Sequence, residues 1–172
     1  MDARSPLATD ERQALQFFFE HLREASEQAD APQSELLYNA SVLAHYALTS
    51  TASLDFPRAP VTLGAVFEVF VLDRSQHTDP DIMEAAGSQC LLLTGFFGAQ
   101  LKHRHNVEWF ASLGASFYDR AAFYGADRAR RAMMTTMALR FGFWRRQQAR
   151  LARELAEQAK LARYPLLGAS NN

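Results

Sequence analysis

Cysteine is almost absent from this 172-residue sequence, which contains a single one, Cys90, inside an apolar run at residues 90–93. One thiol cannot form an intrachain disulfide, so a disulfide-stabilised secreted domain is excluded and a reducing, cytoplasmic environment is expected. Because its sequence neighbours are apolar, we expect Cys90 to be buried and unreactive.

Long hydrophobic runs and lysine are also scarce. The longest apolar stretches have about ten residues, whereas a membrane-spanning helix needs about 20, so we expect no membrane partner. Residues 1–6 lack the basic-then-apolar layout of a signal peptide, which again predicts a cytoplasmic protein. Sixteen of the 18 basic residues are arginine, and a GC-rich genome explains this bias as well as phosphate binding does.

Each half of the chain is short of one charge sign. Residues 1–99 carry 14 acidic and 5 basic side chains, whereas residues 100–172 carry 5 acidic and 13 basic ones, although the net charge is only −1. This asymmetry predicts either attraction between the halves or an anionic partner for the basic half.

Motifs for catalysis, cofactors and metals are missing. The sequence has no glycine-rich phosphate loop, no Gly-x-Ser-x-Gly elbow and no His-Glu-x-x-His or Glu-x-x-His pair. His103 and His105 have no third ligand nearby, so they predict a polar turn and not a metal site. Asp79, Asp81 and Glu84 fall at a predicted helix start, where the helix dipole favours carboxylates. We therefore expect no enzymatic activity, no catalytic residue, no cofactor and no metal.

Apolar residues recur at helical spacing along most of the chain. They predict an all-α, single-domain bundle of about six helices at residues 1–164, followed by a flexible tail at residues 165–172. The expected helices cover about residues 10–29, 33–49, 62–73 and 80–103, a segment from Asn106 to Tyr124, and one long basic helix at 127–162. Residues 62–73 favour a strand by propensity, but no second strand-like run exists to pair with them.

The long basic helix carries most of the functional expectation. Its apolar seam predicts that its first half packs on the bundle. Its second half has few large apolar residues, and an isolated helix of this kind is rarely stable in water. We therefore expect a homodimer, or simple closure of the bundle by this helix. The predicted partner-binding residues are Phe141 and Trp144, provided that they are exposed at an interface, with Arg145, Arg146, Arg150 and Arg153.

Three functions follow from these patterns. The first is a non-enzymatic, self-associating interaction or regulatory module with a protein partner of unknown identity. The second is nucleic-acid binding through the arginine-rich helix, which the sequence pI of 6.5 and the absence of recognition motifs disfavour. The third is a small apolar ligand held by Phe96, Phe97, Trp109, Phe110 and Met137, although a well-filled core explains the same residues.

One segment has a familiar arrangement of packing residues. Gly95-Phe96-Phe97, then Val107-Glu108-Trp109-Phe110, Leu113-Gly114 and Tyr118 follow in that order. This spacing resembles a family of uncharacterised bacterial all-helical proteins with a Gly-Phe-Phe, paired aromatics, Gly and Tyr, and covers about a sixth of the chain. Trp109-Phe110 stands where tyrosines are expected. The resemblance implies a compact bacterial helical domain and assigns no chemistry.

Overall fold

The computed structural model describes residues 11–52 and 74–163. Within these ranges it contains α-helices and short 3₁₀ helices but no strand, so the predicted all-α fold is confirmed. The α-helices are α1 (Glu11–Ala25), α2 (Gln33–Ala52), α4 (Pro80–Thr94), α5 (Gly98–Leu101), α6 (Val107–Tyr124), α7 (Arg128–Leu139) and α8 (Phe141–Arg163). The helix expected at 62–73 and the tail at 165–172 lie outside the described residues. No helix in the described ranges has the length and apolarity needed to span a bilayer.

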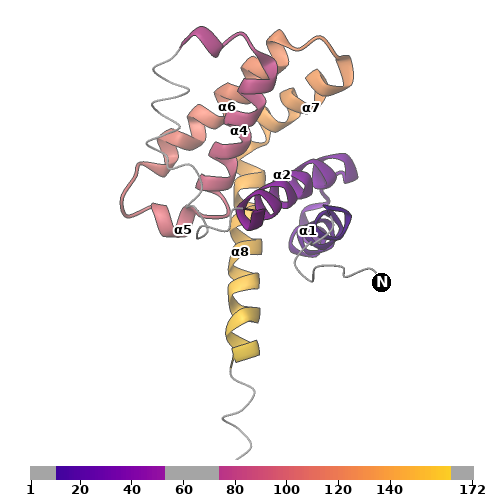
Figure 1. The fold of residues 1–172 in the computed structure, drawn as a ribbon, viewed down its shortest axis with the longest axis vertical. Coiled ribbons are helices and arrows are strands. Elements are labelled where there is room, and N and C mark those ends of the chain that lie inside the picture. The colour runs from indigo at the N-terminus through magenta and orange to yellow at the C-terminus, as the bar shows by residue number, and fades with distance from the viewer. Residues whose placement is uncertain (1–10, 53–73, 164–172) are drawn as a thin grey trace, which may run out of the picture.

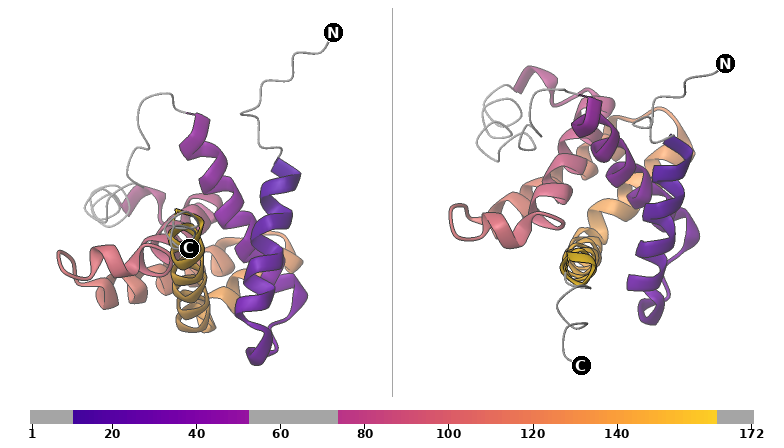
Figure 2. Two further views of the ribbon diagram at one scale, coloured as in Figure 1. Left: turned by 90° about the horizontal axis from the view of Figure 1, so that it is seen from below. Right: turned by 60° about the horizontal axis from the view of Figure 1, so that its bottom comes forward.

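Two helix pairs and one long helix make up the bundle. Helices α4 and α6 pack along each other, α1 packs on α2, and α7 packs on α6 (Figure 1). Helix α8 runs beside both pairs (Figures 1 and 2), and its C-terminal half extends beyond them (Figure 1). Large side chains from all these layers are fully buried where they meet, among them Leu22, Leu43, Met83, Leu91, Phe117 and Trp144.

Three helix starts agree with the sequence prediction. The Asp79 side chain accepts hydrogen bonds from the backbone N–H groups of Asp81 and Ile82 at the start of α4. Asn106 caps α6 in the same way, and Asp127 caps α7. These caps satisfy backbone donors that have no partner inside the helix, which is why such residues mark helix starts.

The predicted helix at 80–103 is wrong in its extent, because α4 ends at Thr94. Gly95 leaves the helical conformation at φ −96° and ψ −84°. A Cβ atom on Gly95 would lie 2.7 Å from the carbonyl oxygen of Leu91 and 3.1 Å from that of Arg145 in α8. This glycine therefore permits both the end of α4 and the close approach of α8.

The predicted single helix at 127–162 is also wrong, because the chain breaks at Arg140, with φ −104° and ψ 17°. Helix α7 packs against α6, and α8 runs in a different direction from α7 (Figure 1). The predicted seam remains buried on both sides of the break, through Met134, Met137, Phe141 and Trp144. Burial of this seam against differently oriented helices explains the break better than local propensity does, and Gly142, a weak helix former, lies two residues after Arg140.

Candidate functional site: an arginine groove between α6 and α7

The structure places two of the sequence-predicted partner-binding residues inside the core. Phe141 is 3% exposed and Trp144 is fully buried, so the expectation that they anchor an interface is wrong for this fold. The indole Nε1 of Trp144 donates a hydrogen bond of 2.7 Å to Glu35 Oε2 on α2. The spacing of these residues showed that they share a helix face, but the covering helices come from distant parts of the chain.

The four predicted arginines of α8 have different surroundings. Arg145 donates from both terminal nitrogens to the Glu108 carboxylate at 2.8 Å, and its Nε donates to the carbonyl of Thr94. This pairing lowers the pKa of the Glu108 carboxyl. Arg150 pairs with Glu154 one turn further along α8. Arg146 and Arg153 are exposed, and no ion pair within the described ranges includes them.

The residues predicted to line an apolar ligand pocket lie in or against the core. Phe110 and Met137 belong to the core cluster, and Phe96 and Phe97 pack against it, while Trp109 is 43% exposed. Phe96 and Phe97 meet edge to face, as do Trp109 and Phe110. The sulfur of Met137 accepts a hydrogen bond from the Asn39 amide on α2. An apolar ligand among these five residues stays a prediction.

An open groove of about 610 Å³ lies instead between the C-terminal half of α6 and α7. Arginine and aromatic side chains line it from both helices. The lining residues are Ser116, Asp119, Arg120, Ala122, Phe123 and Tyr124 from α6, and Arg128, Arg131, Ala132 and Thr135 from α7.

The tight connection between α6 and α7 shapes one end of the groove. The N–H of Gly125 closes α6 by donating to the carbonyl of Ala121, and Asp127 then caps α7. A Cβ atom on Gly125 would lie 3.0 Å from the Arg131 side chain, which crosses this connection. The Nε of Arg131 donates a 3.0 Å hydrogen bond to the carbonyl of Ala122. A carbonyl at a helix C-terminus favours a cation, so Arg131 is held in place as part of the groove wall.

The other two arginines of the groove are available to a ligand. Neither Arg120 nor Arg128 forms an ion pair or a side-chain hydrogen bond within the described part of the chain, and both are exposed. A guanidinium group presents several N–H donors in a planar fork that matches a carboxylate or a phosphate. The groove therefore presents two guanidinium groups that no described residue pairs with.

Exposed aromatic rings lie beside these arginines. Phe123 is 74% exposed and Tyr124 is 41% exposed, and their rings meet edge to face with centroids 4.9 Å apart. Exposed aromatic side chains next to arginine are the residue types that most often dominate binding energy at protein interfaces.

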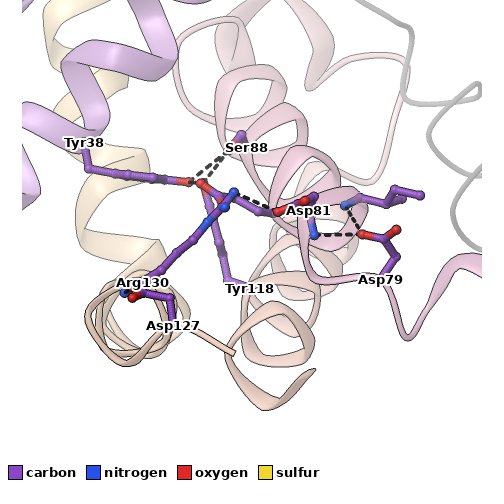
Figure 3. Close-up of polar contacts among 9 residues, drawn as sticks. Tyr38, Asp79, Asp81, Ser88, Tyr118, Asp127 and Arg130 are labelled. Carbon is purple, nitrogen blue, oxygen red and sulfur yellow. Dashed lines mark hydrogen bonds and ion pairs between the residues drawn. The ribbon is translucent and has the colours of Figure 1, made fainter. Parts of the chain in front are cut away.

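A second polar cluster connects α2, α4, α6 and α7, and it extends from the buried Tyr118 to the exposed Arg130 and Asp81 (Figure 3). Tyr38 donates to Glu84 at 3.1 Å, and the hydroxyls of Ser88 and Tyr118 lie 3.0 Å apart. Arg130 of α7 donates to Glu84 at 2.7 Å and lies 3.0 Å from Asp81. Burial raises the pKa of both tyrosines above the usual value of 10. Since these groups have partners within the cluster, we interpret the cluster as a structural network that stabilises the packing of the four helices.

Metal-binding and thiol chemistry have little support among the described residues. No group of three or more His, Cys, Asp or Glu side chains that could hold a metal ion occurs there. His103 is exposed, and the ring of His105 lies edge-on to Phe110. Cys90 is buried in the core, and burial raises the pKa of its thiol to about 12, which keeps it protonated and unreactive at neutral pH.

Comparison with known proteins found no matching family model and no significantly similar curated protein or solved structure. The bacterial origin expected from the resemblance of residues 95–118 stays a prediction. The sequence does contain a signal for the groove, because Arg120, Phe123, Tyr124 and Arg128 fall within nine residues. Their exposure depends on how α7 turns back along α6, and local spacing does not determine that turn.

Proposed function

We propose that this chain is a non-enzymatic, cytoplasmic interaction module, and that the groove between α6 and α7 binds an acidic segment of a protein. One observation carries the proposal: Arg120 and Arg128 line the same groove without a partner among the described residues, beside the exposed rings of Phe123 and Tyr124. Carboxylates of the segment would pair with the two guanidinium groups, and an apolar side chain would pack on the aromatic rings.

The composition of the groove favours a polypeptide over a nucleic acid. Asp119 also lines it, with no ion pair to any groove arginine in the described structure. Every nucleotide carries a phosphate, so a nucleic acid would bring one against this carboxylate, whereas an acidic peptide can place a neutral residue there and offer its backbone N–H donors. The whole chain is also slightly acidic, with a net charge of −1, which does not favour non-specific association with nucleic acid.

Fluorescence anisotropy with two labelled probes tests this proposal. The first is a twelve-residue peptide rich in glutamate with one central phenylalanine, and the second is a twelve-nucleotide oligothymidine. We expect the peptide to bind at low salt and the oligothymidine to bind more weakly. The double variant Arg120→Glu/Arg128→Glu should weaken peptide binding at least about tenfold, because each reversed charge now repels the ligand.

The double variant Arg146→Glu/Arg153→Glu is the matched control. It makes the same change in net charge on exposed α8 residues outside the groove. Equal losses in both variants would mean that only net charge attracts the peptide, and the groove would not be the site. Tighter binding of the oligothymidine than of the peptide would replace the proposed function with nucleic-acid binding.

A further inference from the structure

The partner of the groove can be sought in the chain itself, because the described part of its acidic half has carboxylates that form no ion pair with the described part of its basic half. Within the described residues, arginines pair across the two halves only with Glu35, Asp81 and Glu84. No ion pair described includes Glu20 or Glu24 of α1, and both are exposed. Glu20 accepts a hydrogen bond only from the neutral Gln16 amide.

These carboxylates share a face of α1 with an exposed aromatic ring. Phe17, Glu20 and Glu24 are spaced by three and four residues, which places them on one helix face. Phe17 is 43% exposed, and its ring stacks against His21 with centroids 4.1 Å apart. The opposite face of α1 is buried through Ala14, Leu22 and Ala25. The exposed face therefore presents a phenylalanine followed by two acids.

We infer that this face of α1, which we call the α1 acidic face (Phe17, Glu20 and Glu24), docks into the α6–α7 groove of a second copy of this chain. The inference rests on the proposed function and names its partner. Glu20 and Glu24 pair with Arg120 and Arg128 of the other copy, and Phe17 packs against the exposed Phe123 ring.

The α1 acidic face is as long as the α7 wall of the groove. From Phe17 to Glu24 the α1 acidic face extends about 10 Å, at 1.5 Å per residue. The groove-lining residues of α7, from Arg128 to Thr135, span the same number of residues and therefore the same length. Helix α1 would lie along α6 and α7 as a third helix.

The α1 acidic face can reach this groove only in another copy of the chain, because α1 packs against other helices in its own copy. It packs against α2 and α8, whereas the groove is built from α6 and α7 (Figure 1). Two copies related by a two-fold axis would each contribute one α1 acidic face and one groove, which closes the assembly as a dimer with two equivalent contacts. The opposite charges of the chain's halves are then satisfied across subunits.

A charge swap with the full chain tests the inference, with mass measured by light scattering and sedimentation at 50 mM and 500 mM salt. Variant one is Glu20→Lys/Glu24→Lys, and variant two is Arg120→Glu/Arg128→Glu. The native chain should be a dimer at low salt that dissociates at high salt. Each variant alone should dimerise at least about tenfold more weakly, since its two surfaces now repel. An equimolar mixture should restore a dimer, because the basic α1 of variant one matches the acidic groove of variant two.

Two controls complete the experiment. Arg146→Glu/Arg153→Glu and Glu157→Lys change exposed charges of α8 outside both surfaces and should leave the mass unchanged. Far-UV circular dichroism should show native helicity in every variant. A native chain that stays monomeric at low salt, a dimer that neither variant weakens, or a mixture that does not reassociate would overturn the inference. If the native monomer still binds the acidic probe peptide through Arg120 and Arg128, the proposed function stands without this partner.

Discussion

At the scale of single residues, close helix contacts depend on positions that have almost no side chain. Gly114 of α6 faces Cys90 of α4 and the ring of Phe141 of α8, so three helices meet there. A Cβ atom on Gly114 would lie 2.6 Å from Cys90 Cβ and from the Phe141 ring, closer than real Cβ atoms approach. This glycine sets the spacing of the core.

Gly114→Ala is therefore expected to destabilise the fold. Overpacking a core typically costs about 1–3 kcal/mol, which exceeds the roughly 1 kcal/mol that alanine gains in helix propensity. Urea unfolding followed by circular dichroism should show a lower midpoint. Gly142→Ala is the control, because a Cβ there meets only the end of the Arg146 side chain at 3.5 Å. The control should match or exceed native stability. Equal behaviour of the two variants would contradict the close contact.

The buried hydroxyls and thiol predict an alkaline limit of stability. In the unfolded chain tyrosine ionises near pH 10, whereas burial raises the pKa of Tyr38 and Tyr118 in the folded chain. Burial also raises the pKa of Cys90 from 9.0 to about 12. The folded state thus holds protons that the unfolded state releases. The contribution of these three groups to stability is therefore constant at neutral pH and is lost as the pH rises above about 9, by up to about 1.4 kcal/mol per pH unit and group.

Urea midpoints at pH 8 and pH 10.5 measure this loss. Tyr118→Phe should lower stability at pH 8 by about 1 kcal/mol, because Ser88 and Tyr38 lose a hydrogen-bond partner. It should also reduce the loss between the two pH values. Tyr124→Phe, at an exposed position, should leave the pH dependence as in the native chain. An unchanged dependence in Tyr118→Phe would show that this hydroxyl does not titrate on unfolding.

At the scale of helices, the starts were predictable and the breaks were not. Asp79, Asn106 and Asp127 cap helices through bonds to residues two or three positions away, so the sequence alone contains the interaction. The breaks at Gly95 and Arg140 depend on α8 and α2, which approach from distant parts of the chain. Helical spacing likewise identified Trp144 as part of a seam, but could not show that α2 covers it.

Glu35 connects α2 to the break between α7 and α8. Its buried carboxylate accepts from Trp144, and Arg140 Nε lies 2.8 Å from it. The Arg140 N–H does not point at the carboxylate, so this contact is an ion pair and not a hydrogen bond. Asn39, one turn later on α2, accepts a hydrogen bond from Gln148 of α8.

Glu35→Ala should destabilise the chain by about 1–3 kcal/mol, because the buried Trp144 N–H loses its acceptor. Glu35→Gln should cost less, since an amide oxygen can still accept from the indole. Urea unfolding gives the stabilities, and the indole N–H resonance of Trp144 reports the hydrogen bond directly. Glu157→Ala, an exposed change on α8, should have almost no effect. A Glu35→Ala chain as stable as the native one would exclude this contact as a support of the break.

At the scale of the whole molecule, charge asymmetry was visible in the sequence, while its distribution in space was not. Counting charges predicted either attraction between the halves or an anionic partner for the basic half, and Arg130 and Arg140 do pair with acids of the N-terminal half. The sequence also placed the working surface on the last helix. The structure divides the predicted helix into α7 and α8 and buries part of α8 in the core. The groove arginines that pair with no described residue lie on α7 (Arg128) and on α6 (Arg120).

A change at the end of α8 distinguishes two hypotheses for self-association. The sequence predicted an interface on α8, whereas the structure leads to one between the α1 acidic face and the groove. Beyond Leu155 the described side chains of α8 are exposed, and Leu161 is 76% exposed. Leu161→Lys should therefore leave the fold intact, with a free energy of unfolding within about 0.5 kcal/mol of the native value. It should also keep the native mass at low salt, because the α1 acidic face and the groove are intact. Conversion of a native dimer to a monomer by this substitution would place self-association on α8, where the sequence alone had suggested it.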